Sequence, residues 1–244
     1  MTTYGLEAIQ ADLYAVLADV VRVLEAHELP YSAICGTLLG AVRHQAIIPW
    51  DDDVDLVLPR ESFDRLMEVY PQVCGESFKL DVSDTWVPRV RKVGGAAFVD
   101  LFVLDPLPVG RVARAWKLFR LKTLQGMLKR CPEYHRFPLA KRVLLWATHM
   151  MGMLFPWETK LSAYRRIARS GGQSPWLHMS NGAYSLLSVP LEKGTFQEPV
   201  PAPFGQLTVR IPREAELVLT KLYGKDYMTP PPEHERRPLH LDRR

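Results

Sequence analysis

The stretch AICGTLLGAVRHQAIIPWDDDVDLVL, residues 33–58, decides the fold of this chain. Its opening apolar run, 33–35, predicts a short strand, and Gly36–Thr37 predict a tight turn after it. Apolar residues at helical spacing follow and predict a short helix. This helix has to end by Pro49, because proline lacks an N–H and restricts the residue before it. Residues 50–58 alternate between polar and apolar side chains, which predicts a second strand.

Three consecutive aspartates open the second predicted strand. A period of two places Asp53 and Asp55 on one face and points Asp52 away from them. Two carboxylates on one face repel each other strongly where the dielectric constant is low, so a half-buried strand of this kind favours a bound cation. Carboxylate oxygens suit Mg²⁺ or Mn²⁺. The pattern therefore predicts a metal site at Asp53 and Asp55, and an exposed acidic strand end is the alternative.

The Gly36–Thr37 turn carries a second functional signal. The backbone N–H groups at the start of a helix have no intrahelical acceptor and attract anions. We therefore expect the amides of Gly36 and Thr37 to hold a phosphate beside the acidic strand.

A further acid interrupts the apolar run AFVDLFVL, residues 97–104, which predicts a buried strand. An acid there costs roughly several kcal/mol unless it is paired or binds a metal. Residues 86–93 predict another strand, with Arg89 and Arg91 on one face. A salt bridge from Asp100 to one of these arginines and a metal-binding role for Asp100 are both compatible with the sequence.

The block CGTLLGAVRHQAIIPWDDDVDL closely resembles the signature of the LicD/fukutin family of phosphotransferases, which have a nucleotidyltransferase fold. The shared pattern is Gly-Ser/Thr, a short helix, and Asp-apolar-Asp-apolar, here Gly36–Thr37 and residues 53–56. Val99-Asp100-Leu101-Phe102, followed by Asp105–Pro106, matches a third acid of that family. The resemblance is strong over 33–105 and moderate over 190–240. It implies a mixed sheet flanked by helices, an α+β fold, with Asp100 completing a carboxylate triad.

The family resemblance also implies a reaction. Its members transfer an alcohol phosphate, such as phosphocholine or ribitol phosphate, from a CDP-linked alcohol to a hydroxyl of a cell-surface glycan or its lipid-linked precursor, and release CMP. Mg²⁺ or Mn²⁺ would be held by the three acids, with Asp100 also a candidate general base. The expected partners are therefore a CDP-linked donor and a glycan acceptor, and no nucleic acid.

The remaining candidate site residues are cationic. Arg43 and His44 match the Ala-Val-Arg-His of the family and are expected to neutralise developing charge. Arg91 and Lys92 are expected to contact the donor phosphates. A choline payload would favour an aromatic cage, whose candidates are Trp50, Trp86, Trp176, Tyr184 and Tyr227.

The length and composition of the chain limit the number of domains, the kind of partner and the cellular compartment. The chain has 244 residues, of which 47% are hydrophobic, and this suits one domain spanning 1–244. The net charge of +4 fits anionic partners. The three scattered cysteines predict reduced thiols in a cytoplasmic protein. The N-terminal apolar pattern contains acids and is not typical of a signal peptide, and no apolar run reaches the length of a membrane span.

A basic segment, 111–170, is predicted to form a helical insertion in the domain. Between Asp105 and Glu158 the single acid is Glu133. Aromatic, Leu and Met residues lie between the cations, so the segment is compatible with ordinary packing over the core or with an anionic membrane surface. In the second case the protein would work at the inner face of the membrane.

Three other functions remain open from the sequence. A nucleotidyltransferase would move a nucleoside monophosphate to a sugar, protein or RNA and release diphosphate. A glycosyltransferase with an Asp-x-Asp motif would transfer the sugar, although it would normally lack the Gly-Thr turn ahead of the acids. A non-catalytic membrane module would depend on the basic segment alone.

Overall fold

The fold is an α+β arrangement of a mixed sheet with helices packed around it. The computed structural model describes residues 4–83, 86–129 and 138–238. In this part of the chain the main sheet has seven strands, and two more form a separate hairpin. The strands are β1 (Ser32–Ala33), β2 (Val54–Pro59), β3 (Phe78–Asp81), β4 (Arg89–Lys92), β5 (Phe98–Pro106), β6 (Trp176–Met179), β7 (Leu191–Glu192), β8 (Val200–Phe204) and β9 (Leu207–Ile211). The α-helices are α1 (Glu7–Ala26), α2 (Cys35–Arg43), α3 (Arg60–Val73), α4 (Arg111–Leu128), α5 (Leu139–Met153), α6 (Trp157–Arg169) and α7 (Ala215–Tyr223).

The parallel pair β2 and β5 forms the centre of the sheet. β1 joins the free edge of β2 in the antiparallel sense, and β4 and then β3 join β5 on its other side. β6 and β7 extend the sheet from the far end of β5. In the register of the central pair, Asp55 lies directly opposite Asp100. The two acids that the sequence places on separate strands are therefore neighbours across one ladder.

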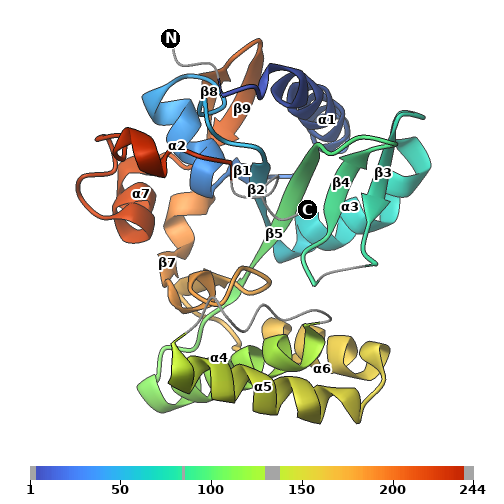
Figure 1. Ribbon diagram of the computed structural model, residues 1–244, viewed down its shortest axis with the longest axis vertical. Helices are drawn as coiled ribbons and strands as arrows, with labels where there is room; N and C mark the ends of the chain where they lie inside the picture. Colours follow the sequence, from blue (N-terminus) through green and yellow to red (C-terminus); the bar gives the residue numbers. More distant parts are fainter. Residues whose placement is uncertain (1–3, 84–85, 130–137, 239–244) are drawn as a thin grey trace.

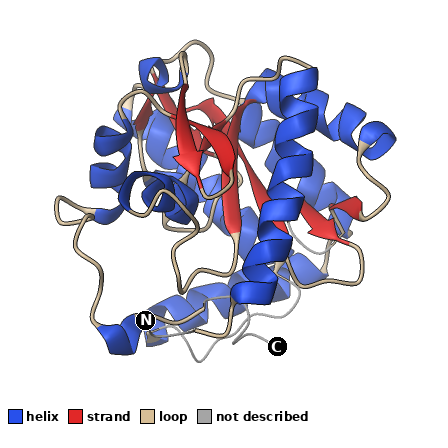
Figure 2. Cartoon of the chain, turned by 90° about the horizontal axis from the view of Figure 1, so that it is seen from above, coloured by secondary structure: helices blue, strands red, loops and turns tan. Residues whose placement is uncertain are grey.

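Helices cover the sheet on both sides, as the view from above shows (Figure 2). α1 and α3 pack against each other and against the central strands. α2 contacts β2 on one side and α7 and the β8–β9 hairpin on the other. The large core between these elements includes fully buried side chains of α1 and β2, such as Leu13, Leu17, Leu56 and Leu58. The predicted mixed sheet flanked by helices is confirmed.

The helices α4, α5 and α6 form a layer below the sheet (Figure 1). They lie within the predicted basic insertion, 111–170, and have a smaller apolar cluster of their own, which includes Leu121, Leu161 and Tyr164. Residues 130–137, with two of the predicted cations, lie outside the described residues. None of the described helices is both long and apolar enough to cross a membrane.

A buried ionic network joins this layer to the sheet. Asp105, near the end of β5, is fully buried and accepts hydrogen bonds from Arg60 at 2.9 and 2.5 Å and from the hydroxyl of Ser180 at 2.5 Å. Burial alone would raise the pKa of Asp105, but the hydrogen bonds and charge of Arg60 outweigh it and lower that pKa. Lys117 of α4 donates to the backbone carbonyls of Pro106, Ala168 and Ser170. The hydrogen bond from Lys117 to Pro106 thus attaches the helical layer to the C-terminal end of β5.

Four local predictions need correction. Gly36 and Thr37 lie inside α2 and not in a turn, because Cys35 already takes a left-handed backbone conformation, with φ of 49°, and starts the helix. The second strand begins at Val54, so residues 50–53 form a loop. Pro71 predicts the end of the helix that begins after the second strand, but this helix, α3, continues to Val73.

The fourth correction concerns the stretch before β9, residues 190–206, whose many prolines predict a loop. Residues 200–204 form β8, a strand with prolines at alternate positions. A two-stranded hairpin has an open edge, and proline is tolerated on an edge strand because its missing N–H is not needed there. Further along the chain, residues 185–189 contain the 3₁₀ helix η2 (Leu186–Ser188).

Removing the Asp105 carboxylate from the buried ionic network should destabilise the protein strongly. The variant Asp105→Ala leaves Arg60 and Ser180 without their acceptor, and we expect the free energy of unfolding to fall by about 3–5 kcal/mol. Urea denaturation followed by circular dichroism measures this change. The matched control is Glu198→Ala, which breaks an exposed ion pair with Arg213 at 2.9 Å and should cost at most about 1 kcal/mol. Equal effects of the two variants would contradict a structural role for Asp105.

A second prediction concerns pH. Burial, followed by the charge of Lys117, lowers the pKa of His178 to about 4. Since the unfolded chain protonates His178 near pH 6.5, it binds more protons than the folded state between pH 6.5 and 4, and the folded state loses stability as the pH falls through this range. The variant His178→Gln lacks this penalty. We expect the stability of the wild type relative to the variant to fall by about 3 kcal/mol from pH 7 to pH 4. A constant difference across these pH values would contradict the prediction.

Candidate active site

A cavity of about 1220 Å³ lies beside the acidic end of β2. The start of α2, the acidic loop and β5 form one wall, and α4 and α5 contribute another. The last turn of α7 and residues 226–237 complete the lining. No residue of α1 or α3 is among those that line it. The cavity therefore lies between the sheet, the helical layer and the C-terminal segment.

The three predicted acids come together in this cavity. Asp53 precedes β2, Asp55 is the second residue of β2, and Asp100 is its neighbour on β5. Each offers a carboxylate oxygen, and these oxygens all lie within 4.8 Å of one another. Asp55 and Asp100 are buried, with 8% and 5% of their surface exposed. Such a set of oxygen donors has the chemistry and spacing that a divalent cation requires.

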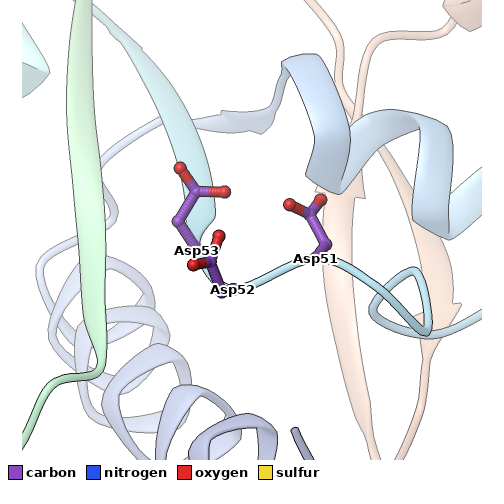
Figure 3. A group of neighbouring side chains, drawn as sticks. All are labelled: Asp51, Asp52 and Asp53. Atoms are coloured by element: carbon purple, nitrogen blue, oxygen red, sulfur yellow. The ribbon is translucent and has the colours of Figure 1, made fainter. Parts of the chain in front are cut away.

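A second group of carboxylates shares Asp53. Oxygens of Asp51, Asp52 and Asp53 also lie within 4.8 Å of one another, and Figure 3 shows the three side chains gathered at the loop before β2. The expectation that Asp52 points away from Asp53 is wrong. Strand alternation does not govern these residues, because β2 begins only at Val54.

The carboxylates of the cluster repel one another, and burial and this repulsion shift the pKa of two of them. Burial, followed by the negative charge of Asp53, raises the pKa of Asp51 to about 8. Burial and the charges of Asp53 and Asp100 raise the pKa of Asp55 well above its ordinary value. Repulsion of this kind is relieved by protonation or by a cation, and a cation would relieve it at neutral pH. The site residues present thus fit a divalent metal ion.

Arg89 offsets part of this negative charge. It stands opposite Asp100 in the β4–β5 ladder and binds both carboxylate oxygens, with nitrogen–oxygen distances of 2.5 and 3.1 Å. Its guanidinium also lies over the ring of Phe98, 4.3 Å from the centroid. The salt bridge that the sequence left open is confirmed, and Asp100 belongs to the acidic cluster at the same time, while its metal-binding role stays a prediction.

The start of α2 faces the acidic loop. Its first backbone bond runs from the Leu38 N–H to the Ile34 carbonyl, so the N–H groups before Leu38 have no acceptor within the helix. A Cβ at Gly36 would lie 2.5 Å from Oδ2 of Asp51, so this close approach requires glycine. An acidic side chain is favoured at this end of a helix by the helix dipole.

The side chain of Thr37 has a structural role, in addition to the phosphate binding predicted for its amide. Its buried hydroxyl accepts a hydrogen bond from the Asp55 N–H at 2.7 Å. On the same residue, the Asp55 carbonyl accepts from the Ile34 N–H at 3.2 Å. The backbone of Asp55 is therefore held between β1 and α2, which fixes where its carboxylate points.

The predicted cations separate into two groups. Arg43 lines the cavity and donates to the backbone carbonyl of Tyr227 at 2.9 Å. His44 is not among the lining residues and packs edge-on against Trp50. Burial lowers the pKa of both side chains, and the charge of Arg43 lowers that of His44 further.

Arg91 and Lys92 do not join the site. Arg91 forms a salt bridge with Asp81 at 2.9 Å, and Lys92 forms one with Asp12 at 2.5 Å. Neither lines the cavity. Their predicted contact with donor phosphates stays a prediction that the geometry does not support.

Three lining residues were missed as site candidates: Asp51, Arg89 and Tyr223. Asp51 belongs to the Asp-Asp-Asp run, and the assumption of a strand through residues 50–53 hid its approach to α2. Tyr223, the last residue of α7, keeps 48% of its surface exposed and reaches the cavity from the C-terminal side. Its position could be anticipated only from the C-terminal part of the family resemblance.

The comparisons with known proteins agree with this arrangement. Residues 28–102 match the family model described as LicD/FKTN/FKRP, nucleotidyltransferase domain. Over 89% of its length the chain is 24% identical to the lipopolysaccharide cholinephosphotransferase LicD of Haemophilus influenzae, of which it covers 89%. Shorter matches occur with uncharacterised proteins of Rickettsia prowazekii (43% over 60 residues, 25% of this chain and 23% of that protein) and Rickettsia typhi (32% over 91 residues, 37% and 28%).

The matched region contains the whole acidic cluster, from the start of α2 to Asp100 on β5. The similarity to the Haemophilus protein continues beyond it, through most of the chain. Residues 28–102 therefore carry the pattern of the LicD family domain, and most of the chain is similar to a LicD protein.

Proposed function

We propose that the protein is a metal-dependent phosphotransferase. It transfers an alcohol phosphate from a CDP-activated donor to a hydroxyl of a cell-surface glycan or its precursor, and CMP leaves. The observation that carries this proposal is the cluster of Asp53, Asp55 and Asp100 at the wall of a cavity large enough for a nucleotide-linked donor. The similarity to the Haemophilus lipopolysaccharide cholinephosphotransferase supports it.

The acids hold the proposed metal ion, Mg²⁺ or Mn²⁺. When bound, the ion supplies charge neutralisation for the donor phosphates and the developing charge of the transferred group. Asp53 and Asp55 are its ligands, and Asp100 completes the set or accepts the proton of the attacking hydroxyl. Arg89 keeps the Asp100 side chain in a fixed orientation through two hydrogen bonds.

The other walls position the donor. The amides at the start of α2 hold a phosphate at the positive end of the helix. Arg43 adds a cation at the last residue of the same helix and donates to the backbone carbonyl of Tyr227. Phosphoryl transfer depends mainly on positioning and on charge stabilisation of this kind.

Aromatic side chains favour phosphocholine among the possible payloads. A quaternary ammonium group binds against aromatic faces. Seven aromatic residues of the described chain line the cavity: Trp50, Trp86, Phe102, Phe119, Tyr184, Tyr223 and Tyr227. Trp176, the remaining candidate, is not among the lining residues. A polyol phosphate such as ribitol phosphate is the competing payload.

The proposal extends to the fold and the location. We infer a nucleotidyltransferase-like core from the parallel β2–β5 pair with acids in register and from the description of the matching family model. The expected cytoplasmic location remains a prediction.

Donor specificity and metal dependence can be tested in one assay. The purified protein is incubated with CDP-choline, CDP-ribitol, CDP-glycerol or CDP-ethanolamine, Mg²⁺ and a crude glycan acceptor, and CMP is quantified. We expect CMP from one donor, its loss on addition of a chelator, and restoration by Mg²⁺ or Mn²⁺. The variant Asp53→Asn should lower the rate by about 10³-fold, because it weakens charge stabilisation worth several kcal/mol.

The matched control for this assay is Glu198→Gln, which also removes one negative charge. Glu198 is exposed, pairs with Arg213 and does not line the cavity. It should keep the wild-type rate. Diphosphate release from nucleoside triphosphates, with no CMP from any CDP-linked alcohol, would instead favour a nucleotidyltransferase.

A second variant tests the close approach of α2 to the acidic loop. Gly36→Ala should displace the Asp51 carboxylate and lower kcat/KM on the order of 10²-fold, because small displacements in a positioned site have effects of this size. The unfolding midpoint should change little. Gly194→Ala is the control, since a Cβ there meets no atom within 4 Å. Full activity of Gly36→Ala would show that this approach has no role in the reaction.

A further inference from the structure

The outer surface of α4 and α5 is unusually apolar for a surface exposed to water. Val112, Trp116 and Phe119 recur along one side of α4 at spacings of four and three residues, and all are exposed. The rings of Trp116 and Phe119 stack with centroids 5.7 Å apart. On and just after α5, the exposed apolar side chains are Leu139, Val143, Leu144, Trp146, Met150, Met151, Met153, Leu154 and Phe155. We call these residues of the two helices the α4–α5 face.

The α4–α5 face exists because α5 is bound to the rest of the protein along one side. Gly126 of α4 lies against Thr148, and Gly152 of α5 lies against the backbone of Met127, so a side chain at either glycine would collide. Lys160 of α6 donates to the carbonyls of Met127 and Gly152 and fixes the same junction. The opposite side of α5 is left exposed, with Leu154 just after it 78% exposed.

The charged side chains of α4 and α5 all have one sign. Arg111, Arg120 and Arg142 are exposed on the two helices. Neither α4 nor α5 contains an acidic residue. A face that combines tryptophan, long apolar side chains and arginine complements a surface with anionic headgroups above an apolar interior.

We propose that the α4–α5 face docks on an anionic lipid membrane, with α5 lying along the interface. The apolar side chains enter the region between headgroups and acyl chains, and the arginines remain at the headgroups. This is peripheral binding, in agreement with the lack of a membrane-spanning helix among the described residues. A second copy of the chain fits less well, because a twofold contact through this face would bring cations against cations.

The face is continuous with the cavity. Phe119 and Leu144 are exposed residues of the α4–α5 face, and both also line the cavity. Docking would therefore bring one edge of the cavity to the membrane surface. The binding proposal goes beyond the proposed transfer reaction and does not depend on it, although an acceptor anchored in lipid would be reached directly in this orientation.

Vesicle sedimentation tests the proposal with the whole protein. Vesicles of phosphatidylglycerol and phosphatidylcholine (3:7) are compared with pure phosphatidylcholine at low and high salt. We expect binding to the anionic vesicles and weakening by salt. Val143→Glu combined with Trp146→Glu should reduce the partition coefficient on the order of tenfold or more, since both side chains would enter the interface. Arg111→Glu combined with Arg120→Glu should have a similar effect that is confined to anionic vesicles.

Matched controls place the same changes elsewhere. Val93→Glu adds a charge at a valine that is 54% exposed and lies outside the α4–α5 face. Arg65→Glu reverses a charge on α3, also outside that face. Both should bind vesicles as the wild type does. Circular dichroism and the unfolding midpoint show whether each variant is folded, and a misfolded Val143→Glu/Trp146→Glu protein is replaced by Met150→Ser/Met153→Ser.

Two results would overturn the proposal: no binding of the wild type to anionic vesicles at low salt, or equal binding by folded face variants. A dimer in solution that the Trp146 change dissociates, without vesicle binding, would assign the face to a second copy instead. CMP release with a water-soluble acceptor separates this proposal from the proposed function. That rate should be unchanged in the Val143→Glu/Trp146→Glu variant, because neither residue lines the cavity.

Discussion

The repulsion among buried carboxylates is the constraint on which the site depends. The parallel pairing of β2 and β5 sets Asp55 beside Asp100, and the loop before β2 adds Asp53 at the same point. A protein would ordinarily avoid such an arrangement, because each additional buried charge raises the energy of the others. The core of α1, α3 and the central strands provides the stability that allows the cluster to form. A strained group that a large core holds in place is typical of a functional site.

The surroundings of the cluster limit this repulsion without removing it. Arg89 binds Asp100, Asp51 lies at the positive end of α2, and Thr37 holds the backbone of Asp55. Each of these contacts also fixes the orientation of a carboxylate. The same contacts that make the acids tolerable therefore hold them in fixed orientations, so the proposed metal ion would bind with little rearrangement.

Much of this could be predicted from the sequence, and the failures have physical causes. The acidic strand, the buried Asp100 and the basic helices each leave a periodic pattern that does not depend on tertiary contacts. The position of Asp51 and Asp52 could not be found this way, because alternation was extended through a loop. The partners of Arg91 and Lys92 depend on how β3, β4 and α1 lie in space, and charge alone does not reveal them. Tyr223 reaches the cavity only through the packing of α7 on α2.

The cavity is assembled from segments that are far apart in the chain. Its walls include Cys35 at one extreme and Arg237 at the other, and the Arg43–Tyr227 hydrogen bond spans 184 residues. Contacts of such long range form slowly, because the chain loses the entropy of closing a long loop before the contact can stabilise it. The sheet and its acids need only residues 32–106 for their strand pairing. Strand pairing within 32–106 therefore sets the acids side by side, whereas the cavity beside them takes shape only when residues beyond this range, up to Arg237, are packed together with it.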